Sequence, residues 1–335
     1  MPMKSLRQAI NEAIDHEMAR DPRIVLIGED IAGGKEASGE QDAWGGVMGV
    51  TKGLLGKYGP DRVLDTPISE TALIGAATGA AVAGLRPVAE LMFNDFLGVC
   101  FDQIMNQAAK LRYMFGGRVK TPLVIRSQFG AGLRAAAQHS QSLYALFTHV
   151  PGLKVVVPSN AYDAKGLLIS AMRGDDPVIF LEHKFMYDME ADVPDEAYTI
   201  PLGEANLVRE GDDVCVIALG RMVHTADEAI AKLRDDGISC SLIDLRTTSP
   251  LDEDLILEMT EECGRVVIVD EANPRCSIAA DISSIIAEKG FHSLKAPIRK
   301  VTAPHTPIPF APVLEDAYIP SAAKVEAAIR DVMGG

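Results

Sequence analysis

The chain has 335 residues, which exceeds the length at which a single hydrophobic core keeps growing, so two domains are expected. Hydrophobic residues make up 47% of the chain, yet no apolar run reaches the roughly 20 residues that a membrane span needs. The formal net charge of −15 argues against a nucleic-acid-binding protein and against binding to an anionic membrane surface. The five cysteines show no CxxC spacing, so we interpret them as reduced thiols of a cytoplasmic protein.

The first half of the chain alternates expected helices with expected strands. The pattern predicts helices over 5–20, 51–58, 71–85, 101–115 and 161–172, and strands over 23–30, 62–65, 87–93, 121–126, 153–157 and 178–181. The first helix carries charges throughout, which argues against a signal peptide. This alternation is typical of a mainly parallel sheet with helices on both faces, whose ligands lie beyond the carboxyl ends of the strands. Glu29, Phe96, residues 128–141 and Glu182 fall at such ends.

Residues 188–200 are acidic and show neither a helical nor a strand period, so they are expected to link two α/β domains, 1–187 and 201–335. The second domain repeats the alternation. The pattern predicts strands over 213–218, 239–245, 265–270 and 298–302, and helices over 222–236, 253–262, 278–289 and 322–332. A proline-rich segment, 304–312, precedes the last helix.

The chain is expected to be organised around residues 65–96. Ser69 is placed to cap a helix and Glu70 lies in its first turn, where the helix dipole favours a carboxylate. Residues 71–85 carry no charge and are mostly small, which predicts a buried helix without a solvated face. The next strand ends in an exposed turn and delivers Met92 and Phe96 nearby. A carboxylate beside an apolar wall and an aromatic ring could hold a flat, basic heterocycle.

The GxGxxA motif at 130–135 has two interpretations. It is the dinucleotide-binding fingerprint, but that function needs an acidic residue at the end of the next strand to hold a ribose. The strand at 153–157 ends instead in Pro158, Ser159 and Asn160. We therefore prefer a tight glycine turn.

Four candidate residues keep a structural alternative. His139 is either a histidine at a helix start, bonded to the backbone, or a catalytic acid or base. Glu70 could be a plain carboxylate at a helix start. Asp270 and Glu271 end a strand and could face a ligand, but an ion pair between subunits is the preferred interpretation.

Short motifs spread over nearly the whole chain carry a resemblance. They are DTPISE at 65–70, GLRP at 84–87, DQ at 102–103, YM at 113–114, GG at 116–117, AQHSQ at 137–141, PGLKVV at 151–156, DAKGL at 163–167, DLRT at 244–247 and LED at 314–316. With these motifs the chain resembles the beta subunit of the thiamine-dependent first component of 2-oxo acid dehydrogenase complexes. The resemblance implies a parallel-sheet, transketolase-like pyrimidine-binding domain followed by a transketolase C-terminal-type α/β domain.

The resemblance also assigns roles to residues. It implies that Glu70 holds the pyrimidine nitrogen of thiamine diphosphate and drives the tautomer that activates the cofactor. Phe96 would stack on the pyrimidine, and Ile68 and Met92 would line its pocket. His139 would serve acyl transfer to a lipoyl group. Two other classes stay open from the residues alone: a nicotinamide oxidoreductase and a non-catalytic assembly protein.

The resemblance further implies a partner chain. In the family, a GDG motif of the alpha subunit holds the diphosphate and its Mg²⁺, and this chain has no such motif. The expected assembly is therefore a heterotetramer of two alpha and two beta chains, which works with a lipoyl-bearing dihydrolipoamide acetyltransferase. The family also holds a potassium ion on backbone carbonyls. The matching positions here are Leu123, Ala171, Met172, Gly174 and Asp176.

Four segments narrow the resemblance to acetoin dehydrogenase beta subunits. They are DAWGGV at 42–47, RTTSP at 246–250, DEANPRC at 270–276 and TAPHT at 302–306. The implied activity is the cleavage of acetoin, transfer of the acetyl unit to a lipoyl group and release of acetaldehyde. Pyruvate dehydrogenase beta subunits are the alternative, with oxidative decarboxylation of pyruvate as the activity.

Overall fold

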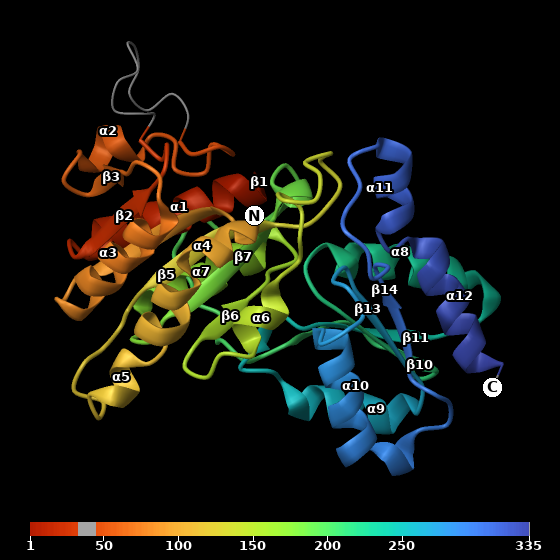
Figure 1. The fold of residues 1–335 in the computed structure, drawn as a ribbon. Coiled ribbons are helices and arrows are strands. Elements are labelled where there is room, and N and C mark those ends of the chain that lie inside the picture. The colour runs from red at the N-terminus through yellow and green to blue at the C-terminus, as the bar shows by residue number, and fades with distance from the viewer. Residues whose placement is uncertain (33–44, 335) are drawn as a thin grey trace. The chain divides into compact units, whose positions relative to one another are not determined.

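The computed structural model describes residues 1–32 and 45–334 (Figure 1). Residues 42–44 of the DAWGGV motif lie outside the described residues. Contacts between Cα atoms divide the chain into two compact units. The first unit contains Met1–Phe129 and Leu146–Leu202, and the second contains Gly130–Ala145 and Gly203–Gly335. The domain boundaries expected at residues 187 and 201 stay a prediction.

A parallel sheet forms the centre of the first unit, as the sequence predicts. Its strands lie in the order β6-β7-β5-β4-β2-β3, and each neighbouring pair is parallel. The strands are β2 (Ile24–Gly28), β3 (Val63–Asp65), β4 (Arg86–Phe93), β5 (Val124–Phe129), β6 (Lys154–Val156) and β7 (Val178–His183). Every residue of β5 and β7 is buried, which is typical of strands covered on both faces.

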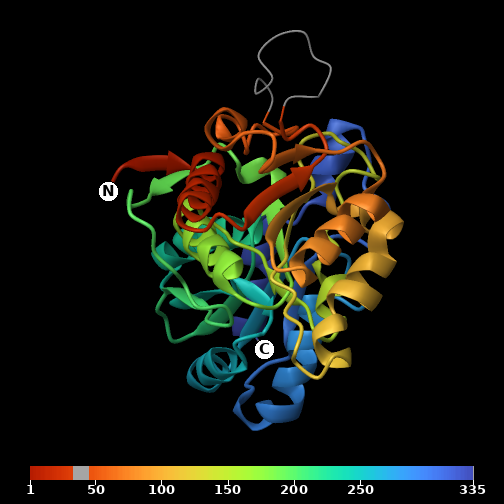
Figure 2. The ribbon, with the colours of Figure 1, turned by 90° about the vertical axis from the view of Figure 1, so that its left-hand side faces the viewer.

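Helices cover both faces of this sheet. Figure 2 shows α1 (Leu6–Arg20) and α7 (Ala161–Arg173) side by side on one face, and α3 (Glu70–Val82) and α4 (Leu97–Asp102) on the other. The shorter helices are α2 (Leu54–Tyr58), α5 (Leu111–Met114) and α6 (Tyr144–Thr148). Ser5 and Gln8 form a capping box that starts α1, since each side chain bonds the backbone N–H of the other residue. In the described part of the chain, none of the helices combines the length and apolar composition needed to cross a membrane.

Helix α3 differs from the expected buried helix. Its inner side is buried through Leu73, Ile74, Ala77, Thr78 and Ala81. The other side, which includes Ala76 and Gly79, is exposed in this single chain. The uncharged composition therefore does not reflect packing within the chain. The exposed side of α3 consists mostly of small residues and is available for packing against a partner.

Two local expectations around α4 are wrong. The helix expected over 101–115 is interrupted by a π-helix, Gln103–Ala108, between α4 and α5. Its wider turn, marked by the bond from Ala109 N–H to Ile104 C=O at 3.0 Å, has no signature in a 3.6-residue pattern. Asn94, expected to be exposed, is completely buried and donates from Nδ2 to the Gln128 carbonyl at 3.3 Å. It holds the end of β4 against β5.

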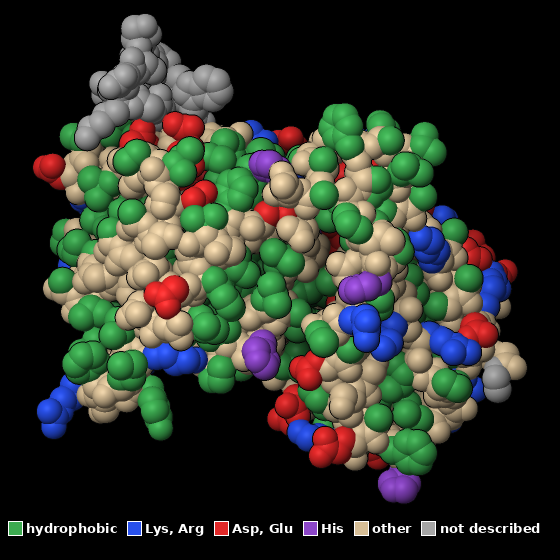
Figure 3. Space-filling view, viewed as in Figure 1, with side chains coloured by type: hydrophobic (Ala, Val, Ile, Leu, Met, Phe, Trp, Pro, Cys, Tyr) green, Lys and Arg blue, Asp and Glu red, His purple; other side chains and the backbone are tan. Residues whose placement is uncertain are grey.

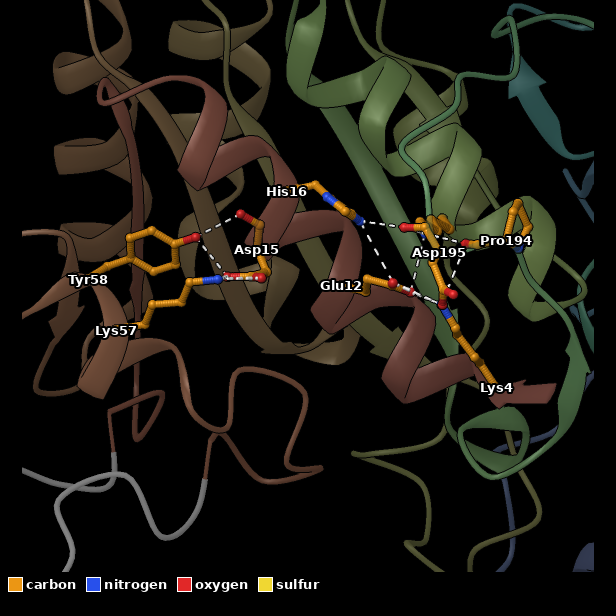
Figure 4. Close-up of polar contacts among 9 residues, drawn as sticks. Lys4, Glu12, Asp15, His16, Lys57, Tyr58, Pro194 and Asp195 are labelled. Carbon is orange, nitrogen blue, oxygen red and sulfur yellow. Dashed lines mark hydrogen bonds and ion pairs between the residues drawn. The ribbon is translucent and has the colours of Figure 1, made fainter. Parts of the chain in front are cut away.

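The segment 188–200 is fixed to the first unit. Contrary to expectation it contains a strand, β8 (Glu190–Asp192), which pairs antiparallel with β1 (Met3–Ser5). The buried Lys165 ammonium donates to the carbonyls of Pro194 at 2.6 Å and Asp195 at 3.1 Å. The ring of His16 on α1 bonds the same Asp195 carbonyl at 2.8 Å (Figure 4). Burial lowers the pKa of Lys165, because these acceptors replace only part of the hydration that its ammonium loses.

A buried charge network crosses the middle of the sheet. The Arg126 guanidinium donates to both Glu182 oxygens at 2.7 Å and to Glu90 Oε2 at 2.8 Å. The Tyr187 hydroxyl donates to Glu182 at 2.6 Å. One guanidinium cannot neutralise two carboxylates, and burial raises the pKa of Glu90. The network fixes the register of β4, β5 and β7, which carry the edge where ligands of parallel sheets lie.

The second unit has a sheet in the order β14-β13-β10-β11-β9. Its strands are β9 (Asn206–Arg209), β10 (Val214–Ala218), β11 (Cys240–Asp244), β13 (Val266–Asp270) and β14 (Arg299–Thr302), with the short β12 (Thr247–Ser249) after β11. Its helices are α8 (Arg221–Leu233), α9 (Glu253–Cys263), α10 (Ile278–Lys289), α11 (Pro312–Tyr318) and α12 (Ala322–Met333). All of these strand pairs are parallel except β11 with β9. The structure thus confirms the predicted α/β class.

The sequence does not predict β9, β12 or α11 of this unit. Strand β9 is an antiparallel edge strand of four residues, two of them apolar. Helix α11 lies where the sequence predicts only a proline-rich connection. Pro312 occupies the first turn of α11, where a missing N–H costs no hydrogen bond.

Candidate functional site

Glu70 is the first residue of α3, and its side chain is half-buried. Ser69 is the N-cap by position, with extended φ and ψ of −127° and 156°, but its side chain makes no capping hydrogen bond. The first N–H groups of α3 therefore lack the side-chain partner that the sequence suggested. The helix dipole at this end favours an ionised carboxylate.

The charge of Glu70 affects two neighbouring groups. Glu29, at the end of β2, has a raised pKa because of burial first and then because of Asp30 and Glu70. Burial and the Glu70 charge raise the pKa of the buried Cys100 thiol on α4 to about 12. The carboxyl groups of Glu29 and Glu70 and the thiol of Cys100 thus lie near the carboxyl ends of the strands. The sequence predicts that Glu29 lies at a strand end but indicates no role for it. Glu29 lies near α3 because of the order of the strands in the sheet, which the sequence does not reveal.

Met92 and Phe96 provide the apolar side of this region. Both are half-buried, Met92 on β4 and Phe96 in the turn that follows it. The rings of Phe93 and Phe96 lie edge to face, with centroids 5.6 Å apart. The Cys100 thiol donates to the Phe96 carbonyl, one turn earlier in the chain, at 3.7 Å. Ile68, two residues before α3, is 72% exposed.

These four residues all belong to the first unit, and we call them together the predicted wall. The wall offers a carboxylate as a hydrogen-bond acceptor, an aromatic ring and partly exposed aliphatic groups. Such a set fits an aromatic heterocycle that carries an N–H, because the ring needs apolar contact and the N–H needs an acceptor. The residues therefore suit the pyrimidine that the sequence predicts for them.

His139 belongs to the second unit. Its side chain is half-buried and lies in a turn rather than at the start of a helix. The preceding glycine turn has φ of 94° at Gly130 and 113° at Gly132, a region that favours glycine. The interpretation of His139 as a plain histidine at a helix start is therefore wrong in its local structure.

Carboxylates of the same unit accept hydrogen bonds from the backbone amides of the glycine turn. The N–H of Ala131 donates to Glu271 at 2.7 Å, and the N–H of Gly132 donates to Glu315 at 2.8 Å. An amide bonded to a carboxylate cannot also cradle a phosphate. The geometry supports the preferred glycine turn over a dinucleotide site.

The Asp270 carboxyl group is bonded within the chain. It is completely buried, bonds the Tyr144 hydroxyl, and accepts from the N–H of Ala272 at 2.8 Å and of Ala279 at 3.3 Å. Burial raises its pKa. The preferred ion pair between subunits is therefore wrong for Asp270, whose carboxyl group fixes the start of α10.

The carbonyls proposed for potassium lie around the end of α7. Arg86 donates to the Met172 carbonyl at 2.9 and 3.0 Å and also to the Gly174 carbonyl. The Leu123 carbonyl accepts from Val178 at 2.9 Å, and the Ala171 carbonyl accepts from Gly174 at 3.2 Å. A carbonyl oxygen has two lone pairs, so the Leu123 and Ala171 carbonyls can accept a second partner, whereas the Met172 carbonyl already accepts from two nitrogens of Arg86. Potassium at these positions stays a prediction.

Comparisons with known proteins agree with this fold. The chain matches the family "Transketolase, pyrimidine binding domain" over residues 3–189 and "Transketolase, C-terminal domain" over 203–325. A solved structure described as "Split gene transketolase, inactive beta4 tetramer" superposes with a TM-score of 0.78 over 98% of each chain. Its sequence identity is 23%, so it supports the fold alone.

Several relatives are similar over their whole length. The beta subunits of acetoin:2,6-dichlorophenolindophenol oxidoreductase from Cupriavidus necator and Bacillus subtilis are 63% and 57% identical. These alignments cover 99% and 98% of the chain and 98% and 97% of the relatives. The pyruvate dehydrogenase E1 component beta subunit of Rickettsia felis is 43% identical over 98% of each chain. The chain therefore belongs to the family of transketolase-like beta subunits of acetoin and 2-oxo acid dehydrogenases.

Proposed function

We propose that this chain is the beta subunit of a thiamine diphosphate-dependent acetoin dehydrogenase. The observation that carries the proposal is the 63% identity to an acetoin:2,6-dichlorophenolindophenol oxidoreductase beta subunit over 99% of the chain. The activity is cleavage of acetoin, with release of acetaldehyde and transfer of the acetyl unit to a lipoyl group. Oxidative decarboxylation of pyruvate is the second candidate, supported by 43% identity to a pyruvate dehydrogenase beta subunit.

Thiamine diphosphate fits the wall formed by Glu70, Ile68, Met92 and Phe96. When bound, the cofactor supplies a nucleophilic carbon and accepts the electron pair released when the neighbouring bond of the substrate breaks. Glu70 would accept a hydrogen bond from the pyrimidine ring, and Phe96 would stack on it. His139 would donate or accept the proton needed when the acetyl unit passes to a lipoyl sulfur, since an imidazole exchanges protons near neutral pH.

The chain would work with an alpha subunit and a lipoyl-bearing acetyltransferase in the cytoplasm. The exposed side of α3 supports a partner chain, together with a group of exposed apolar residues on α3–α5 (Figure 3). The larger members of this group are Val82, Leu85, Val99, Tyr113, Met114 and Phe115. The alpha subunit would hold the diphosphate and Mg²⁺, and the carbonyls around the end of α7 would hold potassium.

Replacement of Glu70 tests the proposal. In the protein assembled with its alpha subunit, Glu70→Gln and Glu70→Ala should lower acetoin turnover by about 10²–10⁴-fold or more. Thermal unfolding should stay close to wild type, since Glu70 has no ion pair with any residue that the structure describes. Glu196→Gln, which removes an exposed carboxylate of the first unit, is the matched control and should keep full activity. Near-normal turnover of Glu70→Ala with thiamine diphosphate bound would rule out this role.

A further inference from the structure

A cavity of about 430 Å³ lies wholly within the second unit, next to the segment that carries His139. One side is formed by residues of the AQHSQ motif and the other by the loop after β14 and by α11. The lining residues are Ala137, Gln138, Gln141, Asn273, His305, Thr306, Pro307, Ile308 and Tyr318. A concave surface with a few convergent polar groups and an apolar patch is typical of a small-molecule site.

The loop of the cavity is held in place by its own hydrogen bonds. Asn273 donates from Nδ2 to the Pro304 carbonyl at 2.7 Å and to the Tyr318 hydroxyl at 3.2 Å. The Thr306 N–H donates to the Pro304 carbonyl at 2.8 Å. The Gln141 carbonyl accepts from Gly130 at 3.3 Å, which holds the opposite side. The cavity is therefore built before any ligand arrives, so ordering it adds little to the cost of binding.

Its polar side chains keep hydrogen-bonding capacity. The Tyr318 hydroxyl accepts a bond from Asn273, and its hydrogen has no acceptor among the residues that the structure describes. The same described residues offer no donor to Asn273 Oδ1 and no partner to the Thr306 hydroxyl or the Gln138 amide. Tyr318 is buried, and burial raises the pKa of its phenol. The phenol thus stays a donor at neutral pH.

Among the described residues, the lining carries no Lys, Arg, Asp or Glu, although such residues make up 24% of the chain. In this described lining, the imidazole of His305 is the one side chain that can carry a positive charge. A carboxylate ligand would therefore find no arginine or lysine partner here. A neutral ligand with a carbonyl and a hydroxyl would meet a donor in Tyr318 and an acceptor in Asn273. Ile308 and Pro307 would contact its methyl groups.

We propose that this cavity binds a small uncharged hydroxyketone, and that Tyr318, Asn273 and Thr306 select it over a 2-oxo acid of similar size. The inference rests on the proposed acetoin dehydrogenase function and adds to it the residues that set substrate preference. Two of the segments that resemble acetoin dehydrogenases supply the cavity: Asn273 belongs to one, and His305 and Thr306 belong to the other. Gln138 and Gln141 flank His139 in the chain.

Binding can be measured apart from turnover by saturation-transfer difference NMR on the full-length chain, with acetoin, pyruvate and lipoamide as separate ligands. Acetoin should give a saturable signal, and pyruvate should bind at least tenfold more weakly. Tyr318→Phe and Thr306→Val each remove one hydroxyl at nearly constant volume and should weaken acetoin binding about 3- to 10-fold. Tyr198→Phe removes a phenol hydroxyl of the first unit and is the matched control.

The outcomes separate this inference from the proposed function. Glu70→Ala should lose turnover and keep the acetoin signal, because the cavity lies in the other unit. The cavity inference alone is wrong if the wild-type assembly turns acetoin over normally but the chain gives no acetoin NMR signal. It is also wrong if the signal is unchanged in both Tyr318→Phe and Thr306→Val. If the chain gives the acetoin NMR signal but the wild-type assembly does not turn acetoin over, the proposed function alone is wrong. Displacement of acetoin by lipoamide would assign the cavity to a lipoyl group and contradict the hydroxyketone.

Discussion

Glu29 and Glu70 lie close enough for one charge to influence the protonation of the other. The pKa of Glu29 is raised by burial, by Asp30 and by Glu70, so the folded chain holds this proton more tightly than the unfolded chain does. The stabilisation from this proton is complete below the unfolded pKa of Glu29. It is lost as the pH rises through the higher folded pKa. At neutral pH, an ionised Glu29 therefore works against folding.

This sign predicts the behaviour of Glu29→Gln. The variant should unfold at a higher temperature than wild type at pH 8 and at nearly the same temperature at pH 4, where wild-type Glu29 is protonated. Thermal unfolding across this pH range measures the difference. Glu196→Gln, which changes an exposed carboxylate, should show no such pH dependence. A constant difference between wild type and Glu29→Gln at all pH values would mean that packing, and not titration, is responsible.

His139 allows a prediction about the two halves of the cycle. If its imidazole serves acetyl transfer to sulfur, His139→Ala should slow transfer to lipoyl groups by about 10²–10⁴-fold, as expected for a lost acid–base group. Cleavage of acetoin, followed with dichlorophenolindophenol as electron acceptor, should change much less. His292→Ala, an exposed histidine after α10, is the control for both assays. Equal losses in the two assays would place His139 in cofactor activation or substrate binding instead.

At the scale of single residues, the sequence is sufficient to predict groups whose members lie near each other along the chain. The positions of Glu70, Met92 and Phe96 at a helix start and around a strand end could be predicted, whereas their roles at a site stay predictions. The place of Glu29 near α3 and the Tyr318 cavity could not be predicted, because strand order and a loop far along the chain bring those groups into place.

Helix α3 shows what a local pattern leaves undetermined. The uncharged stretch fixed the position of the helix within a few residues, but it predicted burial that this chain does not provide. A run of small residues is equally compatible with packing inside one chain and with close packing against another. The same limit explains β9 and the π-helix, since an edge strand with polar residues and one wide helical turn leave no clear periodicity.

The exposed side of α3 predicts an effect on assembly. A Cβ added at Gly79 meets none of the described atoms within 4 Å and the residue is exposed, so Gly79→Leu should leave the chain folded. It should stabilise the helix slightly, because leucine is favoured over glycine by up to about 1 kcal/mol. Against a partner that packs on this side, the leucine should clash and weaken binding of the alpha subunit at least tenfold, measured by analytical ultracentrifugation.

Gly56→Leu is the matched control for this variant. Gly56 is also an exposed helical glycine with no atom within 4 Å of an added Cβ, but it lies on α2. Gly56→Leu should assemble like wild type. If Gly79→Leu also assembles normally, the small-residue side of α3 is not the partner surface.

At the scale of the whole molecule, the two α/β units follow the prediction, whereas residues 130–145 show its limit. This segment continues directly from β5, yet its contacts group it with the second unit. Its amides bond Glu271 and Glu315, which lie more than a hundred residues further along the chain. No local pattern in the sequence indicates such bonds. The segment with His139 therefore had to be located by structure.

The last prediction concerns the complete assembly. In the proposed function the chain contributes one wall for a heterocycle, and the sequence lacks the GDG motif that holds a diphosphate in the family. One side of α3 and the side chains of Tyr113 and Met114 are exposed. Purified alone, the chain should therefore show no acetoin turnover with thiamine diphosphate and Mg²⁺. Titration with its alpha subunit should restore turnover, which should level off at one alpha chain per beta chain. Light scattering should then give the mass of two alpha and two beta chains, since each wall needs an alpha chain to complete it. Full turnover by this chain alone would show that it holds the whole cofactor site and that the alpha subunit is not needed for the chemistry.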